Sequence, residues 1–364
     1  MKKLKKGFIF FGRRKSGDGE EDYYLELKKL THVIIGAESG SGKSVFVQNF
    51  LMNLFFNIEN ISKVFLIDYK KMEFENYKQY ESENLEVCDD FRDSLKKVEE
   101  VKNIMYERIA DKSNIKNGEY QGKFIFLIID EANTIKNRMG GKDEESKIAK
   151  EIEKILIDIN QKGRSARIRM FLITQELSTE GVSSSLINNM QSRMNLKTQT
   201  PNNVQKAIGT DKVLTDAFGI TKEDFRSFPK GRAVFRDGDN GTINMFQTPF
   251  IEIDSDEIRN FVDRQLTRNN KKDEIIEEAK NDYIETKTNK EDEKMKDAHL
   301  IEYDKLRRKL YTHTNLLKSG IDIKKEEKSQ IMENLRIINA EIKENKYNKK
   351  YHEWMLFIVK KWNL

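Results

Sequence analysis

A short glycine-rich segment, Ala37–Val45, carries the clearest chemical signal in the sequence. It reads Ala-Glu-Ser-Gly-Ser-Gly-Lys-Ser-Val and lies between an apolar run, Val33–Ile35, and an amphipathic segment, Val45–Phe56. In such a strand–loop–helix unit, small residues allow successive backbone N–H groups to surround phosphate oxygens at the N-terminus of the helix. The spacing is that of a P-loop, although alanine stands at position 37, where the first glycine usually lies.

The P-loop pattern assigns roles to individual side chains. The Lys43 ammonium would bind the β- and γ-phosphates, and the Ser44 hydroxyl would coordinate Mg²⁺. We therefore expect a nucleoside triphosphate and Mg²⁺ as cofactors. The residues expected to bind the nucleotide are Ala37, Glu38, Ser39, Gly40, Ser41, Gly42, Lys43, Ser44 and Val45.

Two adjacent carboxylates, Asp130 and Glu131, follow a second apolar run, Phe124–Ile129. Open α/β sheets bind ligands at the carboxyl ends of their strands, which is where this run would deliver both side chains. We expect Asp130 to hold Mg²⁺ through water and Glu131 to polarise the attacking water as a general base. Because an acidic pair of this kind distinguishes ATP hydrolases from many GTPases and kinases, the sequence predicts ATP hydrolysis.

Two further positions would complete such a site. Gln175 follows the apolar run Met170–Thr174, and its amide could position the attacking water and sense the γ-phosphate. The basic segment Gln161–Arg169 comes shortly before it. That segment is either a solvated helix end or the source of an arginine that reaches the γ-phosphate of a neighbouring subunit.

The elements that would position these residues alternate along the chain from about residue 31 to about residue 250. Short apolar runs separated by longer amphipathic segments are typical of parallel strands that are buried on both faces and joined by helices. We therefore predict an α/β fold with a mostly parallel sheet. The turn-rich segment 236–242 predicts a closing hairpin. The apolar runs are 32–36, 64–68, 124–130, 170–174, 194–197 and 233–236.

Composition excludes several classes of protein. The 364 residues include 66 Lys or Arg, 61 Asp or Glu and one Cys, which gives a net charge of +5. A single cysteine excludes a disulfide framework and a metal site built on cysteine alone. No run approaches the ~20 mostly apolar residues of a membrane helix, so we expect a cytoplasmic protein without an integral membrane segment. The small charge excess does not by itself indicate nucleic-acid binding.

Charge and apolar spacing divide the sequence into four segments. Residues 1–30 are predicted to be a basic lead-in, and residues 31–265 form the predicted nucleotide-binding domain. Residues 266–298 are almost wholly charged and polar, which predicts a linker or a solvated helix. Apolar residues return at helical spacing in residues 299–364, which predicts a C-terminal helical hairpin or bundle.

Six regions, taken in order, resemble the FtsK/SpoIIIE family of ring-forming DNA translocases. The likeness runs from about residue 11 to about residue 263. The sequence departs from the family pattern at Tyr69, where proline is usual, and at Glu176-Leu177, where Arg-Pro is usual. The regions are Leu27–Gly36, Ser39–Val45, Phe65–Phe74, Gln161–Gln175, Asn188–Arg193, and Gly231–Phe235 together with Pro249–Ile258.

The resemblance implies a RecA-like P-loop core and an ATP-driven motor that assembles as a ring, expected to be a hexamer, around double-stranded DNA. It makes Arg164 the first choice for an arginine acting in trans and Arg193 the second. Family members of cell division and sporulation carry membrane helices before the motor, and this sequence shows none. The chain looks most like compact plasmid, phage or conjugative-element members. Such a member would work with a relaxase, replication or secretion-channel partner, which could also bring it to the membrane.

Two other functions stay open at this point. One is a protein-secretion ATPase of the related type VII kind, although those members usually carry tandem motor domains. The other is a nucleotide-gated scaffold whose helical tail binds a partner. In a DNA motor, basic side chains would contact phosphate in a sequence-tolerant and salt-sensitive way. The candidates are Lys136, Arg138, Lys142, Lys197, Lys206 and Lys212.

Overall fold

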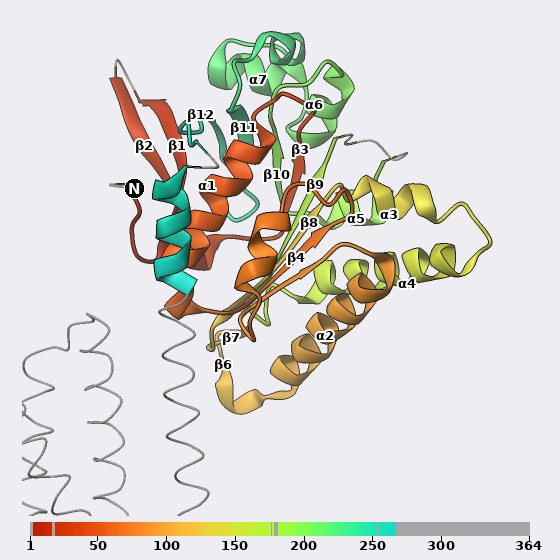
Figure 1. Ribbon diagram of the computed structural model, residues 1–364. Coiled ribbons are helices and arrows are strands. Elements are labelled where there is room, and N and C mark those ends of the chain that lie inside the picture. The colour runs from red at the N-terminus through yellow and green to blue at the C-terminus, as the bar shows by residue number, and fades with distance from the viewer. Residues whose placement is uncertain (1–2, 17–18, 176, 178–180, 253–254, 267–364) are drawn as a thin grey trace, which may run out of the picture. The chain divides into compact units, whose positions relative to one another are not determined.

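The structure is a computed structural model that describes residues 3–16, 19–175, 177, 181–252 and 255–266. These residues belong to one compact unit, Met1–Thr267 (Figure 1). The predicted linker beyond residue 266 and the predicted helical segment at 299–364 lie outside the described residues. Within the described ranges, no helix is long and apolar enough to cross a membrane.

In the described part of the chain, ten strands form one sheet in the order β2-β1-β12-β11-β10-β3-β9-β8-β4-β5. The last six strands of this order are parallel neighbours, and every residue of β8 and β9 is buried. Continuous apolar strands require such cover on both faces, and the predicted α/β fold is confirmed. The parallel strands are β10 (Ser192–Asn195), β3 (Val33–Gly36), β9 (Ile168–Thr174), β8 (Phe124–Asp130), β4 (Ile61–Asp68) and β5 (Leu85–Cys88).

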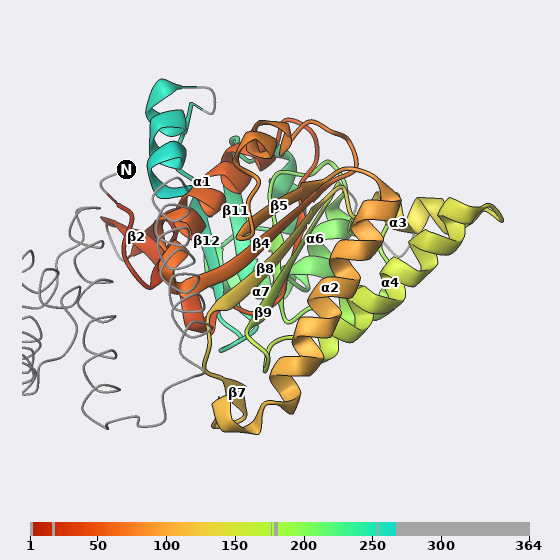
Figure 2. The same ribbon diagram turned by 60° about the horizontal axis from the view of Figure 1, so that its bottom comes forward.

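Helices cover both faces of this sheet (Figures 1 and 2). Phe126 and Ile128 of β8 belong to the core shared with α1 (Lys43–Phe56), whereas Leu127 and Ile129 face the opposite core, as strand alternation requires. A helix at 256–266 lies on the α1 face. The opposite face carries α2 (Phe91–Ala110), α3 (Asn133–Arg138), α4 (Glu144–Lys162), α5 (Ser184–Asn189), α6 (Pro201–Ala207) and α7 (Asp211–Phe218).

An antiparallel half extends the sheet beyond β10. The strands β11 (Arg232–Arg236) and β12 (Ile243–Gln247) pair with Arg236 opposite Ile243, which confirms the hairpin predicted at 236–242. A second hairpin, β1 (Phe8–Ser16) and β2 (Gly19–Glu26), follows at the edge. Short elements connect the rest: η1 (Leu27–Lys29), η2 (Ile58–Asn60), η3 (Glu75–Tyr80), η4 (Lys112–Asn114), η5 (Lys222–Ser227), β6 (Ile115–Lys116) and β7 (Glu119–Tyr120).

The first hairpin differs from the expectation that residues 1–30 are a lead-in outside the domain. Phe11 of β1 is buried and stacks on Phe46 of α1 and Phe235 of β11, with ring centroids 5.9 and 5.4 Å apart. Buried aromatic pairs of this kind stabilise a core beyond their area burial. The hairpin is therefore part of the same folded unit as the P-loop.

Three asparagines, two within α1 and one directly after its last residue, attach this hairpin to the P-loop helix. Asn53 accepts the Phe10 N–H at 2.8 Å, and Asn49 donates to the Phe10 carbonyl at 2.7 Å. Asn57 accepts the Gly7 N–H at 2.7 Å. Spaced four residues apart, the three amides lie on one face of the helix and bond backbone groups of β1 as a neighbouring strand would.

Candidate functional site

The predicted P-loop joins β3 to α1 at the carboxyl edge of the parallel strands (Figure 1). Gly40 and Gly42 adopt φ angles of +73° and +95°, which strain any residue with a side chain. A Cβ on Gly42 would also lie 2.4 Å from the Gly231 backbone nitrogen. That nitrogen donates to the Ser41 carbonyl at 2.8 Å, so the close approach is itself a bonded contact. Position 42 therefore requires glycine on two independent grounds.

The first position of the loop tolerates alanine for a simple reason. Ala37 is buried and lies outside the left-handed region of backbone space. Its N–H donates to the Thr174 carbonyl of β9 at 2.9 Å. The next side chain, Glu38, accepts hydrogen bonds from the Thr198 hydroxyl and, at 2.8 Å, from the Gln199 N–H. The ends of β9 and β10 thus fix the loop in place.

Lys43 is held by the two carboxylates that follow β8. Its Nζ lies 2.8 and 2.7 Å from the two carboxylate oxygens of Asp130 and 3.3 Å from Glu131 Oε1. Burial alone would lower the pKa of Lys43, but the charge and hydrogen bonds of Asp130, together with Glu131, raise it above its ordinary value. Lys43 is therefore firmly cationic, as a phosphate ligand must be.

Glu131 lies between β8 and α3 in a left-handed conformation, with φ +52°. Its Oε1 accepts from Gln175 Nε2 at 2.8 Å and pairs with Lys70 Nζ at 2.9 Å. Burial would raise the pKa of Glu131, but Lys70, Lys43 and Gln175 together bring it below its ordinary value. Strained backbone is often found at functional sites, where the rest of the fold holds it. The structure brings together the four residues Lys43, Asp130, Glu131 and Gln175 that the sequence singled out.

Two further charged side chains enter the site from the segment 68–74, which we call the Asp68 loop. Lys70 reaches Glu131, and Glu73 accepts a hydrogen bond from the Ser44 hydroxyl at 2.8 Å. Neither residue has a role predicted from the sequence, although the segment belongs to one of the regions that resemble the family. The signal that would have found them is sheet order: β4 lies beside β8, so the residues that follow both strands meet at one edge.

The oxygen atoms near Ser44 fit a magnesium ion that is shared with phosphate. In the described part of the chain, no three His, Cys, Asp or Glu side chains are grouped so as to hold a metal ion by themselves. Mg²⁺ is commonly bound by only one or two protein oxygens together with waters and substrate phosphates. The Ser44 hydroxyl and the Asp130 and Glu73 carboxylates could supply such a set. Burial raises the pKa of Asp130 above its ordinary value, and Lys43 opposes this shift.

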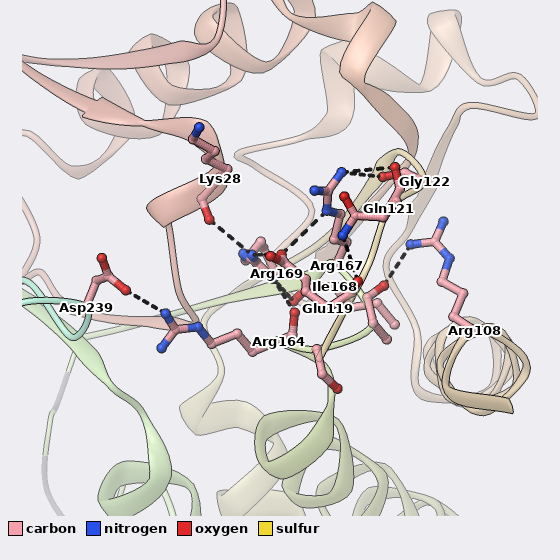
Figure 3. A network of polar contacts seen from close by, with 12 residues as sticks. Lys28, Arg108, Glu119, Gln121, Gly122, Arg164, Arg167, Ile168, Arg169 and Asp239 are labelled. Atoms are coloured by element: carbon pink, nitrogen blue, oxygen red, sulfur yellow. Dashed lines mark hydrogen bonds and ion pairs between the residues drawn. The ribbon is translucent and has the colours of Figure 1, made fainter. Parts of the chain in front are cut away.

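Arg164 lies at the opposite edge of the sheet. It lies four positions before the first residue of β9, whereas the P-loop contacts the far end of β9 at Thr174. At about 3.3 Å per residue, the strand separates Arg164 from the nucleotide site of its own chain by about 20 Å. Its guanidinium, partly exposed, pairs with Asp239 at 2.5 Å and donates to Gln191 at 3.1 Å (Figure 3).

Three more arginines frame the segment that carries Arg164 (Figure 3). Arg169, only 1% exposed, donates to the Arg164 carbonyl at 3.0 Å and lies 3.3 Å from Glu119. Burial lowers the pKa of Arg169 to about 10, and Glu119 opposes this shift. Arg108 donates to the Ala166 carbonyl at 3.0 Å, and Arg167 donates to the Gly122 carbonyl at 2.9 Å. We refer to Arg108, Arg164, Arg167 and Arg169 as the arginine cluster.

Arg193, the second choice for an arginine acting in trans, has a structural position. Its guanidinium donates to the carbonyls of Met190, Ile187 and Lys206 at 3.3, 2.9 and 2.7 Å. These carbonyls lie at or near the ends of α5 and α6, which cationic side chains stabilise. Arg193 therefore ties two helices to β10, and Arg164 remains the better candidate.

Comparison with known proteins finds a family match over part of the chain. Residues 4–119 match the FtsK/SpoIIIE family. The matched residues include the P-loop and the Asp68 loop and end before Asp130, which the structure brings to the same site.

Individual relatives agree with this assignment. DNA translocase FtsK of Helicobacter pylori is 25% identical over 276 residues, which cover 71% of this chain but only 30% of that protein. The structure of the pCW3 conjugation coupling protein TcpA with ATPγS has a TM-score of 0.57 at 19% identity, covering 71% of this chain and 70% of TcpA. The cytoplasmic domain of the type VII secretion ATPase EccC of Thermomonospora curvata has a TM-score of 0.53 at 16% identity, covering 72% and 31%. The shared fold confirms the predicted α/β fold, which is of the P-loop NTPase type.

Proposed function

We propose that this chain is an ATP hydrolase that moves along double-stranded DNA as a ring of identical subunits, with six as the expected number. The observation that carries the proposal is the convergence of Lys43, Asp130, Glu131 and Gln175 at one edge of the sheet. Its biological setting would be DNA transfer, mobilisation or replication of a mobile element. Work in the cytoplasm, with a relaxase, replication or secretion-channel partner that could bring it to the membrane, belongs to the same proposal.

Each side chain of the site has a separate role in the proposed hydrolysis. The backbone N–H groups of the P-loop and Lys43 orient the triphosphate. The Ser44 hydroxyl would coordinate Mg²⁺. Glu131 accepts the proton of the attacking water, while the Gln175 amide keeps the Glu131 carboxylate in position. Mg²⁺, when bound, would neutralise charge on the phosphate oxygens.

A neighbouring copy would complete the site. Among the described residues, no arginine bonds or pairs with Lys43, Asp130, Glu131 or Gln175. An arginine that reaches the transferred phosphate can raise hydrolysis by about 10³-fold or more. Because Arg164 lies at the far end of β9, it can serve only the site of another subunit. This supports assembly as a ring rather than action as a monomer.

Contacts to DNA would come from basic side chains on the surface. Of the candidates, Arg138 pairs with Asp143 and Glu145 at 3.1 and 2.8 Å within its own chain. Lys142, Lys206 and Lys212 are exposed, and we propose these three as phosphate contacts. Binding of this kind should be tolerant of sequence and should weaken steeply with salt.

A protein-secretion ATPase is the second candidate function, because EccC shares the fold. In sequence, the chain is similar over 276 residues to a relative named a DNA translocase. This similarity favours DNA as the cargo. A nucleotide-gated scaffold is the third candidate, and the intact set of Lys43, Asp130 and Glu131 argues against it. The three candidate functions differ in whether DNA stimulates ATP hydrolysis.

The test is the rate of ATP hydrolysis with and without linear duplex DNA. We expect stimulation of several-fold by duplex DNA in the wild type and loss of activity in both Lys43→Ala and Glu131→Gln. Hydrolysis that neither duplex nor single-stranded DNA stimulates would overturn the DNA motor. Nucleotide binding without any hydrolysis would favour the scaffold.

A further inference from the structure

One carboxylate oxygen of Glu131 is in contact with three donors at once. Oε1 lies within 2.8–3.3 Å of three donors: Gln175 Nε2, Lys70 Nζ and Lys43 Nζ. The other oxygen, Oε2, is buried and has no hydrogen-bond partner among the described residues. In the conformation observed here, two ammonium groups are therefore partners of a single carboxylate oxygen.

Lys70 reaches Glu131 from a loop that is itself fixed. The buried Asp68 carboxylate accepts backbone N–H groups of Lys70, Met72, Glu73 and Phe74 at 3.1, 2.8, 2.7 and 3.0 Å. The Lys70 side chain is 44% exposed, whereas its partner Glu131 is 2% exposed. A long side chain on a fixed backbone can exchange one anionic partner for another without moving the loop.

We propose that Lys70 exchanges Glu131 for the γ-phosphate when a triphosphate occupies the site. The inference rests on the proposed ATP site. Lys43 and Lys70 contact the same oxygen of Glu131, so a phosphate that Lys43 binds lies within reach of Lys70. Phosphate oxygens compete for both ammonium groups, which leaves Glu131 bonded to Gln175.

A nucleoside diphosphate would leave this arrangement unchanged. Without a γ-phosphate, Lys70 keeps its ion pair with Glu131. Release of inorganic phosphate after hydrolysis would return Lys70 to Glu131 in the same way. The partner of Lys70 thus depends on the number of phosphates on the nucleotide.

The adjacent lysine provides a matched control. Lys71 belongs to the same loop and carries the same charge, but its Nζ pairs with Asp89 at 3.1 Å instead of Glu131. Lys71→Ala therefore removes one positive charge and one exposed ion pair without touching the nucleotide site. Lys70→Arg keeps the charge, so it should retain most of the ability to distinguish the two nucleotides.

The experiment measures the affinities for ADP and ATPγS by displacement of a fluorescent nucleotide in the presence of Mg²⁺. Lys70→Ala should weaken ATPγS binding by about tenfold or more and change ADP binding by less than about twofold. Lys71→Ala should change neither. Equal losses for both nucleotides in Lys70→Ala, or no loss for either, would overturn this inference alone. A wild-type chain that binds neither nucleotide would overturn the proposed function and the inference with it.

Discussion

The two ends of the same parallel strands carry opposite chemistry. At the carboxyl ends of β3, β4 and β8, the three carboxylates of Glu73, Asp130 and Glu131 lie close to Lys43. At the amino end of β9, the arginine cluster surrounds Glu119 and backbone carbonyls (Figure 3). The first edge is built to receive phosphate and a cation, and the second presents guanidinium groups.

The two edges also satisfy their buried charges differently. Lys43 is paired with Asp130 and Glu131, which are side chains that a nucleotide can replace as partners. Arg169 is bonded to the Arg164 and Ile168 carbonyls, which cannot move away without unfolding the turn. The carboxyl edge is therefore an exchangeable site, and the amino edge is a rigid frame that holds Arg164 at the surface. The carboxyl edge has no arginine beside its described catalytic residues and the amino edge presents Arg164, so the proposed site would be completed by two subunits.

The largest expected effects separate nucleotide binding from hydrolysis at the two edges. Lys43→Ala should abolish hydrolysis and weaken nucleotide binding by at least about tenfold, because it removes the cation of the P-loop. Arg164→Ala should lower hydrolysis by about 10³-fold but leave the nucleotide affinity of its own chain unchanged. Measuring the nucleotide affinity at equilibrium and the rate of ATP hydrolysis for both variants checks these two expectations. A loss of nucleotide affinity in Arg164→Ala would show that the two edges are not separate.

The next effect concerns stability at the amino edge. Arg169→Met should lower the free energy of unfolding by about 3 kcal/mol, because it removes a buried guanidinium that bonds the Arg164 and Ile168 carbonyls and pairs with Glu119. Arg164→Met is the matched control, and it should cost less than about 1 kcal/mol because its ion pair with Asp239 is partly exposed. Denaturant titration of both variants provides the comparison. Similar losses would mean that Arg169 is no more structural than Arg164.

A pH dependence should also come from the amino edge. His32 is fully buried, its Nδ1 accepts the Met170 N–H at 3.0 Å, and burial, with Arg169 and Arg164 nearby, lowers its pKa from 6.5 to about 3. The unfolded chain takes up this proton first, so stability should fall as the pH decreases from about 6.5 toward 3, by up to about 1.4 kcal/mol per pH unit. Unfolding of the wild type and of His32→Asn at about pH 7 and about pH 5 measures this contribution. If both lose the same stability, His32 does not titrate as described.

The smallest effect is expected at Asp239. Its ion pair with Arg164 is partly exposed, so Asp239→Asn should change the free energy of unfolding by less than about 1 kcal/mol. Nucleotide affinity should stay the same, because the contact lies at the amino edge. Thermal melts and nucleotide titrations of this variant test both statements. A large loss of stability would mean that Asp239, rather than Arg169, holds the cluster together.

Much of the nucleotide site could be predicted because its residues follow strands that the sequence makes obvious. Phe124–Asp130 and Ile168–Thr174 are continuous apolar runs, and in parallel sheets the residues after such runs share one edge. Asp130, Glu131 and Gln175 could be placed near Lys43 on that basis. Lys70 and Glu73 could not, because the position of β4 beside β8 is a property of sheet order and not of any local pattern.

The first hairpin was missed for a different reason. The asparagines at positions 49, 53 and 57 look like polar interruptions of an apolar helix when only composition is considered. Their spacing of four residues is the relevant signal, since it places three amides on one helix face, where they bond the backbone of β1. The partner strand lies some 40 residues earlier in the chain, and no local rule connects the two.

Mixing two inactive variants shows whether Arg164 acts at the nucleotide site of a neighbouring subunit. Arg164→Ala subunits keep an intact P-loop, and Lys43→Ala subunits keep an intact arginine. If Arg164 serves the site of a neighbour, the mixture should recover part of the DNA-stimulated ATP hydrolysis that each variant lacks alone. Activity in the mixture equal to that of the separate variants would contradict the account.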